Sequence, residues 1–588
     1  MALRSLNTLC LPSLSPNKPQ TMATERIPYW RLILDHGVLT PRMVSHAYAG
    51  SGTEHDPYIV TWLPDGDPRD PMQWSRLRKW LYMFQVAVAT LAVTLVSSAY
   101  SGGLPGIMSE FDISGEVGIL GLSLFVLGFA IGPLLWAPLS EIYGRQIPFF
   151  VSYAGLTAFC AGAAGSQNAW TLIILRFLAG AVGSSPLANS GGVIADMFTA
   201  RERGIASTLF SAAPFLGPVL GPVIGGFLGM NAGWRWVMGF LAAFSGTVWI
   251  LCSLLVPETY APVLLQKRAA SLSNQTGKVY ISIHEQGKGK KSIKQVIKTA
   301  LSRPWILLFR EPIVLLLAIY IAILYGTLYL CFSAFPIVFE GQRHWNQGVA
   351  GLPFLGVAVG MIAAVTYSIF DNKRYIRAQA KHSGFAPPEA RLPPCFVGSV
   401  AIPISLFWFA WTTSPSSIHW IVPIIAIAPF GFGIVLVFVS VISYLVDAYT
   451  IYAASVLAAN SVLRSLFGAA FPLFTTQMYE NLGTRWASSI PAFLALACVP
   501  LPFLFAKYGP AIRTRCKFAA ESDAFVRRIA ASNGNAASAA TKDVSVSEPK
   551  NPDANGEIDV EVGGHNPGTG VGVQSAASSA TLPSRDPA

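Results

Sequence analysis

Hydrophobic residues in this chain come in long blocks that are separated by polar segments. Each block holds about 20 apolar residues, which as an α-helix span about 30 Å, the thickness of the hydrocarbon layer of a bilayer. The pattern therefore predicts an all-α polytopic membrane protein with twelve transmembrane helices. The predicted helices lie at residues 81–99, 117–136, 148–165, 170–194, 205–228, 237–256, 312–335, 349–370, 395–413, 420–444, 453–474 and 487–506.

The longest polar interruption between blocks, residues 257–311, divides them into two sets of six. It contains ten Lys or Arg residues and three acidic residues. We therefore expect two pseudo-symmetric six-helix bundles, since many transporters are built from internal repeats around a central site. The predicted divisions are a cytoplasmic N-terminal arm (1–80), a first bundle (81–256), a basic cytoplasmic central loop (257–311), a second bundle (312–507) and a cytoplasmic disordered tail (508–588).

Composition narrows the classes of protein further. The chain has 588 residues, of which 52% are hydrophobic and only 12% charged, with a mean hydropathy of +0.48. Soluble proteins carry about 25% charged residues, so a soluble enzyme is excluded. The tail beyond Lys517 is rich in Ala, Ser, Gly and Asn and has no aromatic residue after Phe525. It offers too little apolar surface to offset the entropy of ordering it, and an inert tail is favoured over a regulatory one.

The formal net charge of +11 does not indicate a nucleic-acid partner, because the basic residues lie in loops beside the apolar blocks. With the N-terminus inside, 24 Lys or Arg residues fall on cytoplasmic segments and three on the opposite face, as the positive-inside rule requires. We expect both termini to be cytoplasmic, in the plasma membrane or alternatively the vacuolar membrane. The seven cysteines show no metal-binding spacing, so we expect no metal.

Only two formally charged residues lie within the predicted membrane cores, Arg176 and Arg464. A charge at that depth costs at least ~2.5–3.5 kcal/mol, so it usually faces a cavity and has a function there. The alternative is a structural arginine that is neutralised by backbone carbonyls or extends to the membrane surface. We predict that both take part in transport.

Two acidic residues occupy matching positions at the inner ends of spans four and ten. Asp196 lies in the segment Ala-Asp-Met-Phe-Thr and Asp447 in the segment Val-Asp-Ala-Tyr-Thr. Asp196 is too far along its helix to pair with Arg176, because twenty residues of helix extend about 30 Å. Each acid is a candidate for proton coupling, or alternatively a helix-end acid paired with an arginine of the inner face.

Span five is rich in glycine and proline. Proline bends a helix and glycine allows close helix approach, so this helix is suited to moving against a partner; ordinary membrane packing is the alternative. The motif comprises Gly217, Gly221, Pro222, Gly225 and Gly226.

The loop after span two contains a second candidate motif. Gly144 allows a short turn there. The turn places Glu141 and Arg145 where their charges can clamp adjacent helix ends by hydrogen bonds.

Together these motifs resemble the major facilitator superfamily, and within it the fungal type of the drug:proton antiporter family with twelve spans. The loop after span two is similar to the superfamily's gating motif, residues 176–180 to its span-four arginine motif, and residues 217–226 to the antiporter motif. The fungal likeness rests on residues 70–75, 257–262, 444–449 and 471–474, and the whole resemblance covers about residues 56–517.

The sequence departs from the family pattern at several positions. In the gating motif, Ala137 replaces the first glycine, Glu141 the aspartate and Ile142 a basic residue. No carboxylate lies within the first span, where some bacterial relatives place one for proton coupling; Gln85 is its only strongly polar residue in the inner half. The resemblance implies that Arg176 and Asp196 participate in proton coupling, with Asp447 and Arg464 as further candidates.

The expected function is export of small hydrophobic or amphipathic organic molecules, such as natural products, toxins or antifungal drugs. Transport would use alternating access and proton entry, with no cofactor besides the proton gradient, and we expect a monomer. A candidate substrate cavity comprises Gln85, Tyr325, Tyr329 and Phe332, although these aromatic residues would also fit against lipid or a neighbouring helix.

Other functions in the same or another class are less well supported by the sequence. A polyamine or other metabolite transporter, or a facilitator, is the main alternative, but a polyamine site needs cavity carboxylates that the cores lack. A non-transporting receptor or sensor would need an ordered terminal domain. A channel would need a polar pore, and an enzyme would need a catalytic group at membrane depth.

Overall fold

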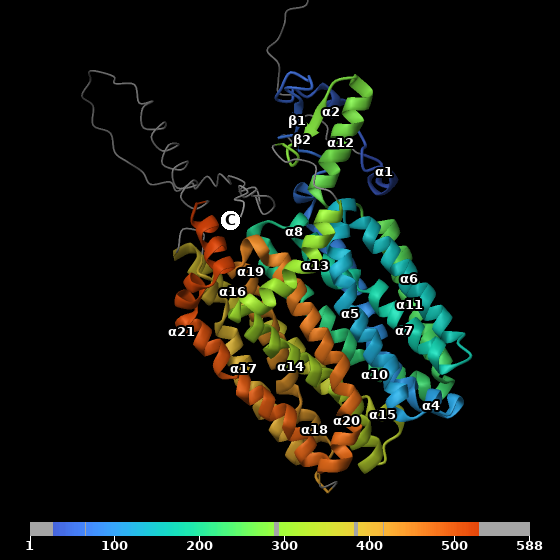
Figure 1. The fold of residues 1–588 in the computed structure, drawn as a ribbon. Coiled ribbons are helices and arrows are strands. Elements are labelled where there is room, and N and C mark those ends of the chain that lie inside the picture. Colours follow the sequence, from blue (N-terminus) through green and yellow to red (C-terminus); the bar gives the residue numbers. More distant parts are fainter. Residues whose placement is uncertain (1–26, 65, 287–292, 382–385, 415–416, 529–588) are drawn as a thin grey trace, which may run out of the picture.

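Long helices run side by side through most of the protein, and a small subdomain projects from one end of them (Figure 1). This computed structural model describes residues 27–64, 66–286, 293–381, 386–414 and 417–528. We call the end that carries α1, α2, α12 and the two strands the arm end, and the opposite end of the bundle the far end.

Eleven helical stretches of the described residues are long and apolar enough to cross a membrane. The last, Thr450–Arg515, is 66 residues long, several times the bilayer thickness. Gly483 interrupts it with a left-handed φ of 69°, where the chain turns back at the far end. This stretch therefore supplies two crossings, and the fold is the predicted all-α polytopic fold with twelve spans.

The first half of the bundle contains six spans, several of them built from consecutive helical segments. These segments are α3 (Arg76–Ala99), η2 (Tyr100–Gly103), α4 (Leu104–Phe111), α5 (Gly115–Tyr143), α6 (Gln146–Ala164), α7 (Ala169–Gly183), α8 (Ser185–Met197), α9 (Ala200–Phe210), α10 (Ala213–Ala232) and α11 (Trp234–Leu255).

The second half repeats this arrangement after the central segment, which itself contains α12 (Ala261–Thr276) and α13 (Ile293–Arg310). Its segments are α14 (Pro312–Phe335), η3 (Pro336–Gln342), α15 (Gln347–Ala350), α16 (Phe354–Lys381), η4 (Pro388–Arg391), α17 (Pro393–Thr412), α18 (Ile421–Ala426), α19 (Ala428–Ala448), η5 (Thr450–Tyr452), α20 (Ala453–Cys498) and α21 (Pro500–Arg515).

Proline and glycine set many of the helix boundaries. Pro312, Pro393 and Pro500 each occupy the first turn of a helix, where the missing N–H has no intrahelical partner to lose. Gly144 and Gly233 end α5 and α10 with φ of 90° and 88°, a backbone conformation that other residues rarely adopt. These turns let consecutive spans reverse direction within a few residues.

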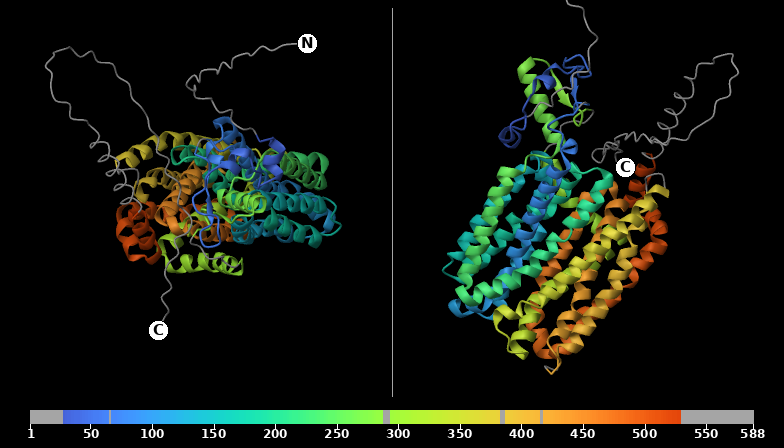
Figure 2. Two further views of the ribbon diagram at one scale, coloured as in Figure 1. Left: turned by 90° about the horizontal axis from the view of Figure 1, so that it is seen from above. Right: turned by 180° about the vertical axis from the view of Figure 1, so that it is seen from behind.

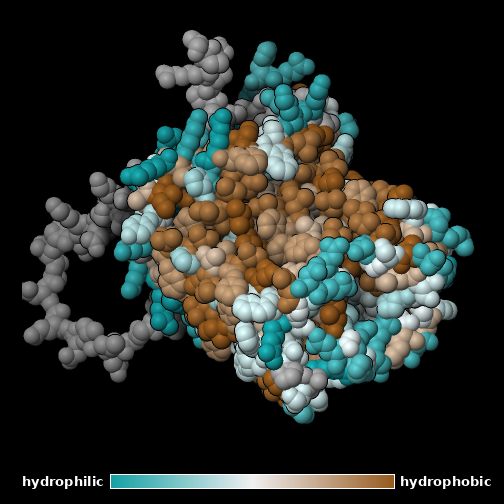
Figure 3. All heavy atoms as spheres, turned by 60° about the horizontal axis from the view of Figure 1, so that its bottom comes forward, coloured by the Kyte–Doolittle hydropathy of each residue, from teal (hydrophilic) through white to brown (hydrophobic). Residues whose placement is uncertain are grey.

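Large apolar side chains cover the flank of the bundle. Figure 3 shows hydrophobic residues over a broad area, with hydrophilic residues gathered around its margins. Phe84, Trp236 and Phe370 are each more than 60% exposed. A water-soluble monomer rarely exposes a contiguous apolar patch of this extent, so this surface faces lipid.

The two halves lie side by side, the first in blue and green and the second in yellow to red (Figure 2, right). Their interface is formed mainly by α5 against α20 along its length, and by α10 against α15 and α16 toward the far end. Within each half, α10 packs on α3 and α14 on α20. The substrate cavity that the sequence predicts is therefore expected between the halves.

The arm and the central segment form a joint subdomain, which the sequence analysis does not anticipate. Strand β1 (Tyr58–Val60) pairs in parallel with β2 (Tyr280–Ser282), and α12 covers them. The short helices α1 (Tyr29–Leu34), α2 (Pro41–Ser45) and η1 (Pro71–Gln73) complete the arm. Its small core joins the two segments through Tyr48, Val60, Leu265, Ala269 and Leu272.

The predicted disordered tail, 508–588, begins too early. Helix α21 continues to Arg515, and residues 517–528 are also helical. Ala519 is fully buried, and the backbone N–H of Phe518 donates to Glu311 Oε1 at 3.0 Å. Apolar contact with the bundle thus orders a segment that would be too polar to fold alone. Residues 529–588 lie outside the described part of the chain.

Candidate functional site

Arg176 lies on α7 and is 1% exposed. Its guanidinium donates to the carbonyl oxygens of Val96 (2.8 Å), Ser97 (3.0 Å) and Gly121 (3.2 Å). No ion pair to Arg176 is found within the described residues. Carbonyl dipoles therefore take the place of an acidic partner, which is the structural alternative raised by the sequence; a role in proton coupling stays a prediction.

Two aromatic rings complete the surroundings of Arg176. Its Cζ lies 4.3 Å from the ring centroid of Phe125 and 4.7 Å from that of Tyr100. A guanidinium over an aromatic face gains cation–π attraction, so the charge is held without a carboxylate.

Arg464, the second arginine in the membrane, lies on α20 in the other half and is 7% exposed. Its Cζ lies 4.8 Å from the ring centroid of Tyr325 and 5.4 Å from that of Phe438. Its Nε has no hydrogen-bond partner among the residues that the structure describes. Arg464 is thus less fully satisfied than Arg176 and is the more available of the two to a ligand.

A chain of contacts joins the two arginines across the interface between the halves. Arg176 donates to the carbonyl of Ser97, and the Ser97 hydroxyl lies 2.8 Å from the hydroxyl of Tyr329 on α14. The Tyr329 hydroxyl accepts from that of Tyr325 at 3.3 Å, and Arg464 packs on the Tyr325 ring. Ser97 and Tyr329 belong to different halves, so their hydrogen bond breaks whenever the halves separate at this depth.

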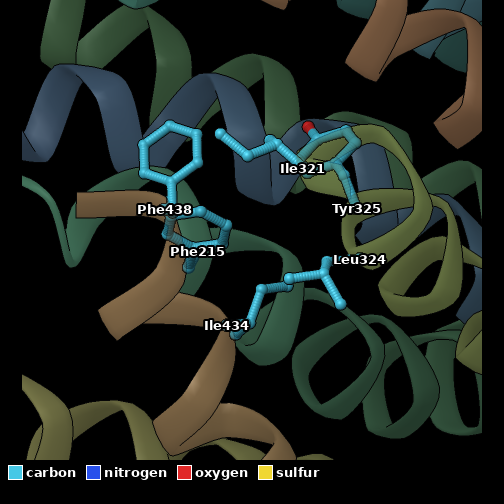
Figure 4. Close-up of a pocket in the computed structure, with 6 residues that line it drawn as sticks. All are labelled: Phe215, Ile321, Leu324, Tyr325, Ile434 and Phe438. Carbon is cyan, nitrogen blue, oxygen red and sulfur yellow. The ribbon is translucent and has the colours of Figure 1, made fainter. Parts of the chain in front are cut away.

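Aromatic and aliphatic side chains surround a closed space beside this chain that is too narrow to admit a water molecule (Figure 4). It is lined by Phe215, Ile321, Leu324, Tyr325, Ile434 and Phe438. Phe215 of α10 and Phe438 of α19 meet edge to face across the interface, with ring centroids 4.8 Å apart. The centre of the molecule is therefore apolar and closed by aromatic contact.

The predicted cavity residues separate into two places. Tyr325 lines this space, Tyr329 contacts it through Tyr325, and Phe332 packs against Tyr329 with centroids 5.0 Å apart. Gln85 does not belong to this cluster: its amide donates to Cys252 Sγ of α11, at 3.4 Å. The side chain of Gln85 points toward the sixth span of its own half, because residue 85 lies on a different face of α3 from Ser97.

The glycines of span five line the contact of α10 with α3. Gly217, Gly221 and Gly225 recur every fourth residue, so they share one helix face. A methyl group on Gly221 would overlap Ser98, and one on Gly225 would overlap the carbonyl oxygen of Ala99. The two helices therefore pack backbone to backbone.

The neighbouring residues of the same motif contact the other half at the far end. A methyl group on Gly226 would lie 2.9 Å from the carbonyl oxygen of Gln347, and the Pro222 carbonyl lies against Gly351. The amide of Gln347 donates to the carbonyl of Gly102. The far end is thus closed by α10 against α15 and α16.

At the arm end, the predicted gating loop forms a clamp within the first half. Arg145 pairs with Asp196 at 3.3 Å and donates to Ser140 Oγ at 2.7 Å. Glu258, which is fully buried, accepts from the backbone N–H groups of Arg145 (2.9 Å) and Gln146 (3.0 Å). A side chain on Gly144 would collide with Glu258, which accounts for the glycine. Glu141 lies in the last turn of α5.

Tyr260 also belongs to this clamp, because its ring packs against the guanidinium of Arg145. The Arg145 Cζ lies 4.6 Å from its ring centroid. Burial raises the pKa of Tyr260 to about 12, so the ring remains a neutral phenol at cellular pH. Asp196 also accepts from Thr259 Oγ1 at 3.4 Å. The clamp therefore joins the ends of α5, α8 and α11.

The second half contains a matching clamp. Arg391 pairs with Asp447 at 2.9 Å and stacks on the ring of Tyr375, with Cζ 3.4 Å from its centroid. Arg513 of α21 binds Glu389 through both oxygens, at 3.0 and 3.1 Å. Asp196 and Asp447, paired by their sequence positions, thus each bind an arginine of the preceding arm-end loop. Neither pair bridges the two halves.

Sequence reasoning missed Ser97, Glu258 and Arg391 as site residues. Ser97 had a usable signal, because it belongs to the polar series Thr90, Thr94, Ser97 in an otherwise apolar span. Glu258 lies in residues 257–262, whose only recognised feature in the sequence is the family likeness. Arg391 could not be recognised as the partner of Asp447 from the sequence, since many arm-end cations are equally close to Asp447 along the chain. Only the tertiary fold decides between them.

The fold and this site define a membrane transporter: two six-helix halves, an apolar centre and a hydrogen bond between the halves. Residues 86–472 match the family model of the Major Facilitator Superfamily. The chain belongs to that superfamily and, by its relatives, to the fungal efflux transporters within it. It is a transporter and not an enzyme.

Several relatives carry this classification. The chain is 70% identical over 506 residues to the "Major facilitator superfamily multidrug transporter mdrA" of Aspergillus fumigatus, covering 86% of this chain and 83% of that one. It is 64% identical over 508 residues to the "MFS-type efflux pump MFS2" of Trichophyton rubrum (86% and 85%). It is 52% identical over 511 residues to the "Efflux pump FUBT" of Fusarium oxysporum (87% and 86%).

Solved structures resemble the fold at low sequence identity. The human organic anion transporter MFSD10 (TETRAN) aligns with a TM-score of 0.52 at 16% identity, covering 72% of this chain and 99% of that one. The proton:xylose symporter XylE aligns with a TM-score of 0.50 at 15% identity, covering 73% and 96%. At these identities the likeness concerns the fold alone.

Proposed function

We propose that this protein exports small hydrophobic or amphipathic organic molecules in exchange for protons, by alternating access of its two halves. The observation that carries the proposal is the chain of contacts from Arg176 through Ser97, Tyr329 and Tyr325 to Arg464. It links the membrane-embedded charges to the interface that must open and close during transport.

The lining of the central space supports the proposed substrate class. Its six side chains are apolar or aromatic, and Arg464 is the charged group beside them. Hydrophobic molecules with a neutral or anionic group suit such a lining, whereas a polyamine would need carboxylates. Natural products, toxins and antifungal drugs are therefore the proposed substrates.

Asp196 is the proposed proton-coupling acid. It is paired with Arg145, so protonation removes one charge of the pair and leaves the arginine without its partner. A proton that changes the relative stability of two conformations can drive their exchange without touching the substrate. Entry of one proton across 100 mV supplies about 2.3 kcal/mol. Asp447, paired with Arg391, is the corresponding candidate in the second half.

The proposed orientation places the arm end in the cytoplasm and the far end outside the cell, with the protein in the plasma membrane. Its basis is the abundance of Lys and Arg in arm-end segments. The proposed working unit is one chain, because the contacts between the halves lie within a single molecule.

The test replaces Asp196 by Asn and measures efflux of a hydrophobic fluorescent dye from proteoliposomes under an imposed acid gradient. Asn keeps the size of the side chain but cannot exchange a proton, so the pH-driven component should fall on the order of tenfold or more. Glu202→Gln is the control, since Glu202 forms a long surface pair with Arg76 at 3.6 Å and should leave efflux unchanged.

Two outcomes would contradict the proposal. Wild-type efflux by Asp196→Asn, with normal insertion, would remove this acid from the mechanism. Dye export by the wild-type protein that persists undiminished with a protonophore would exclude proton coupling altogether, and facilitated diffusion would then replace antiport.

A further inference from the structure

A second hollow lies at the arm end of the second half, away from the transport site. It has a volume of about 560 Å³ and lies between the start of α14 and the end of α21. Three cations border it, Arg310, Arg515 and Lys517, and its apolar lining includes Pro312, Ile512 and Phe518. We call it the basic groove. The proposed mechanism gives it no role.

The three cations of the basic groove carry unbalanced positive charge. All three are exposed, and none forms an ion pair with the residues that the structure describes. Their neighbour Arg513, by contrast, is paired with Glu389 and Asp523. Unpaired cations around one hollow attract an anion.

The acid in the groove wall does not cancel this charge. Glu311 is 1% exposed, and its two carboxylate oxygens accept from the Tyr449 hydroxyl at 2.8 Å and the Phe518 N–H at 3.0 Å. It holds α14 to the helix after α21, and it is turned away from solvent. An anion in the groove therefore meets guanidinium and ammonium groups.

Helix α13 leads into the groove and is amphipathic. Leu307 and Leu308 are buried against the bundle, while Leu301, Trp305 and Phe309 recur every fourth residue and are exposed, Phe309 by 75%. Lys294 and Lys298 lie seven and three residues before Leu301, which places them on the same exposed face of the helix. Viewed from above, α13 lies lengthwise along one edge of the bundle (Figure 2, left). Tryptophan with lysine on one helix face is typical of the membrane–water interface.

We propose that the basic groove binds the headgroup of an anionic phospholipid of the leaflet at the arm end, with its acyl chains along Trp305 and Phe309 of α13. Charge complementarity accounts for the three cations, and continuity with the lipid-facing surface accounts for the exposed aromatics. A soluble anion would need only the cations. The proposed orientation is used solely to identify this leaflet as the cytoplasmic one, which is the anionic one in cells.

The test measures lipid retention by the purified full-length protein in mild detergent, using native mass spectrometry with added phosphatidylinositol or phosphatidylcholine. The groove variant combines Arg310→Gln, Arg515→Gln and Lys517→Gln. The control variant removes three exposed arm-end cations elsewhere, by Lys373→Gln, Arg377→Gln and Lys381→Gln. Each cation near an anionic lipid contributes about fivefold in affinity, so the groove variant should bind phosphatidylinositol on the order of a hundredfold more weakly.

A second variant, Phe309→Ser, leaves every charge in place. It should also weaken binding of phosphatidylinositol, by about tenfold or more, through loss of acyl-chain contact, while its thermal unfolding in phosphatidylcholine stays near that of the wild type. This variant keeps the proposal testable if the triple groove variant unfolds.

Each remaining outcome overturns the proposal. Equal loss in the groove and control variants would show attraction to net charge rather than a site. Retained binding in the groove variant would place the lipid elsewhere. Glycerophosphoinositol, which has no acyl chains, could protect the protein from thermal unfolding as well as phosphatidylinositol does. Together with wild-type binding of phosphatidylinositol by Phe309→Ser, this result would identify the ligand as a soluble anion. These measurements involve no transport, so they fail or succeed independently of proton coupling.

Discussion

At the scale of single residues, the feature that most needs explanation is how two arginine charges are stabilised within the membrane. An arginine at bilayer depth costs at least ~2.5–3.5 kcal/mol, and hydrogen bonds to charged groups each contribute ~1.5–3 kcal/mol. Three carbonyl acceptors therefore suffice to hold Arg176. Arg464 relies mostly on two aromatic rings, so it keeps more capacity to bind a substrate.

The hydrogen bond between Ser97 and Tyr329 gives a prediction at this scale. Tyr329→Phe and Ser97→Ala should each lower the free energy of unfolding by about 1 kcal/mol, because each leaves a buried hydroxyl or its partner unsatisfied. The double variant should cost less than the sum of the two single ones, since both remove the Ser97–Tyr329 hydrogen bond. Tyr329→Phe should be the more costly of the two, because it also removes the acceptor of the Tyr325 hydroxyl. Thermal unfolding of the purified variants measures this coupling.

Tyr444→Phe is the matched control for that experiment. The Tyr444 hydroxyl is buried and has no hydrogen-bond partner in the described part of the chain, so its removal should not destabilise the protein. Fully additive effects of Ser97→Ala and Tyr329→Phe would show that the two hydroxyls do not interact in the folded protein.

At the scale of elements, α10 makes two contacts, one within its own half and one with the other half. One face packs on α3 without intervening side chains, and the residues beside it touch α15 and α16 of the other half. Pro218 and Pro222 lie inside the helix, where each removes one backbone hydrogen bond and permits bending. A bend in α10 would therefore alter the packing within the first half and the closure of the far end together.

A single methyl group tests this arrangement. Gly225→Ala should abolish efflux or reduce it at least tenfold, because the added Cβ meets the backbone of Ala99, which cannot rotate away. Gly239→Ala in α11 is the control, since no atom lies within 4 Å of the added Cβ there. Dye efflux and surface expression are measured for both. Normal efflux by Gly225→Ala would mean that α10 and α3 do not pack this closely during transport.

Sequence patterns were sufficient for the elements that hydrophobicity and local chemistry determine. Block length predicts the spans, and the four-residue spacing of Gly217, Gly221 and Gly225 predicts a close helix contact. The same patterns predicted arginines of the inner face as the alternative partners of Asp196 and Asp447, with the Arg145 and Arg201 loops nearest to Asp196. They could not single out Arg145 and Arg391, because the partner loops are far away in sequence. They also misplaced Gln85, since a polar residue in a span has several faces to choose from and only the packed bundle decides between them.

The short elements of the arm were the least predictable. β1 and β2 have three residues each, too few for a recognisable alternation, and each is stable only in the presence of the other. Likewise, residues 517–528 are polar enough to suggest disorder, and contact with Glu311 and Tyr452 orders them. In both cases the stabilising surface lies in a distant part of the chain.

At the scale of the whole molecule, the protein consists of two halves and a subdomain whose arm packs on the first of them. The hydroxyls of Tyr29 and Tyr82 lie 3.0 Å apart, and His36 Nε2 lies 2.7 Å from Gln146 Oε1. Both contacts join the arm to the first half. In the proposed alternating access, the arm would therefore move with that half, and the second half would move relative to both.

A buried ion pair gives the prediction at this scale. Arg268 of α12 binds both oxygens of Asp67, at 2.7 and 3.0 Å, and the two side chains are 2% and 0% exposed. Asp67→Ala should destabilise the subdomain by about 3–5 kcal/mol, because it leaves a buried guanidinium without its partner. Limited proteolysis within residues 277–286 should then become markedly faster.

The double variant Asp67→Ala, Arg268→Met distinguishes two causes of destabilisation, the uncompensated charge of Arg268 and the loss of the contact itself. It should recover much of the protease resistance, since no uncompensated charge remains. Unchanged proteolysis in Asp67→Ala alone would show that this pair does not hold the arm to the central segment.

The parallel pairing of β1 with β2 also constrains how the protein is made. Residues 61–279, which include the first six spans, connect the two strands. During synthesis β1 emerges long before β2, so the arm waits unpaired until the translocon has inserted the entire first half. A nascent chain that inserts one span wrongly delivers β2 to the other side of the membrane. β1 then lacks its partner strand, and its backbone edge stays accessible to chaperones and proteases. The two-stranded sheet therefore forms only when the spans of the first half have been inserted correctly.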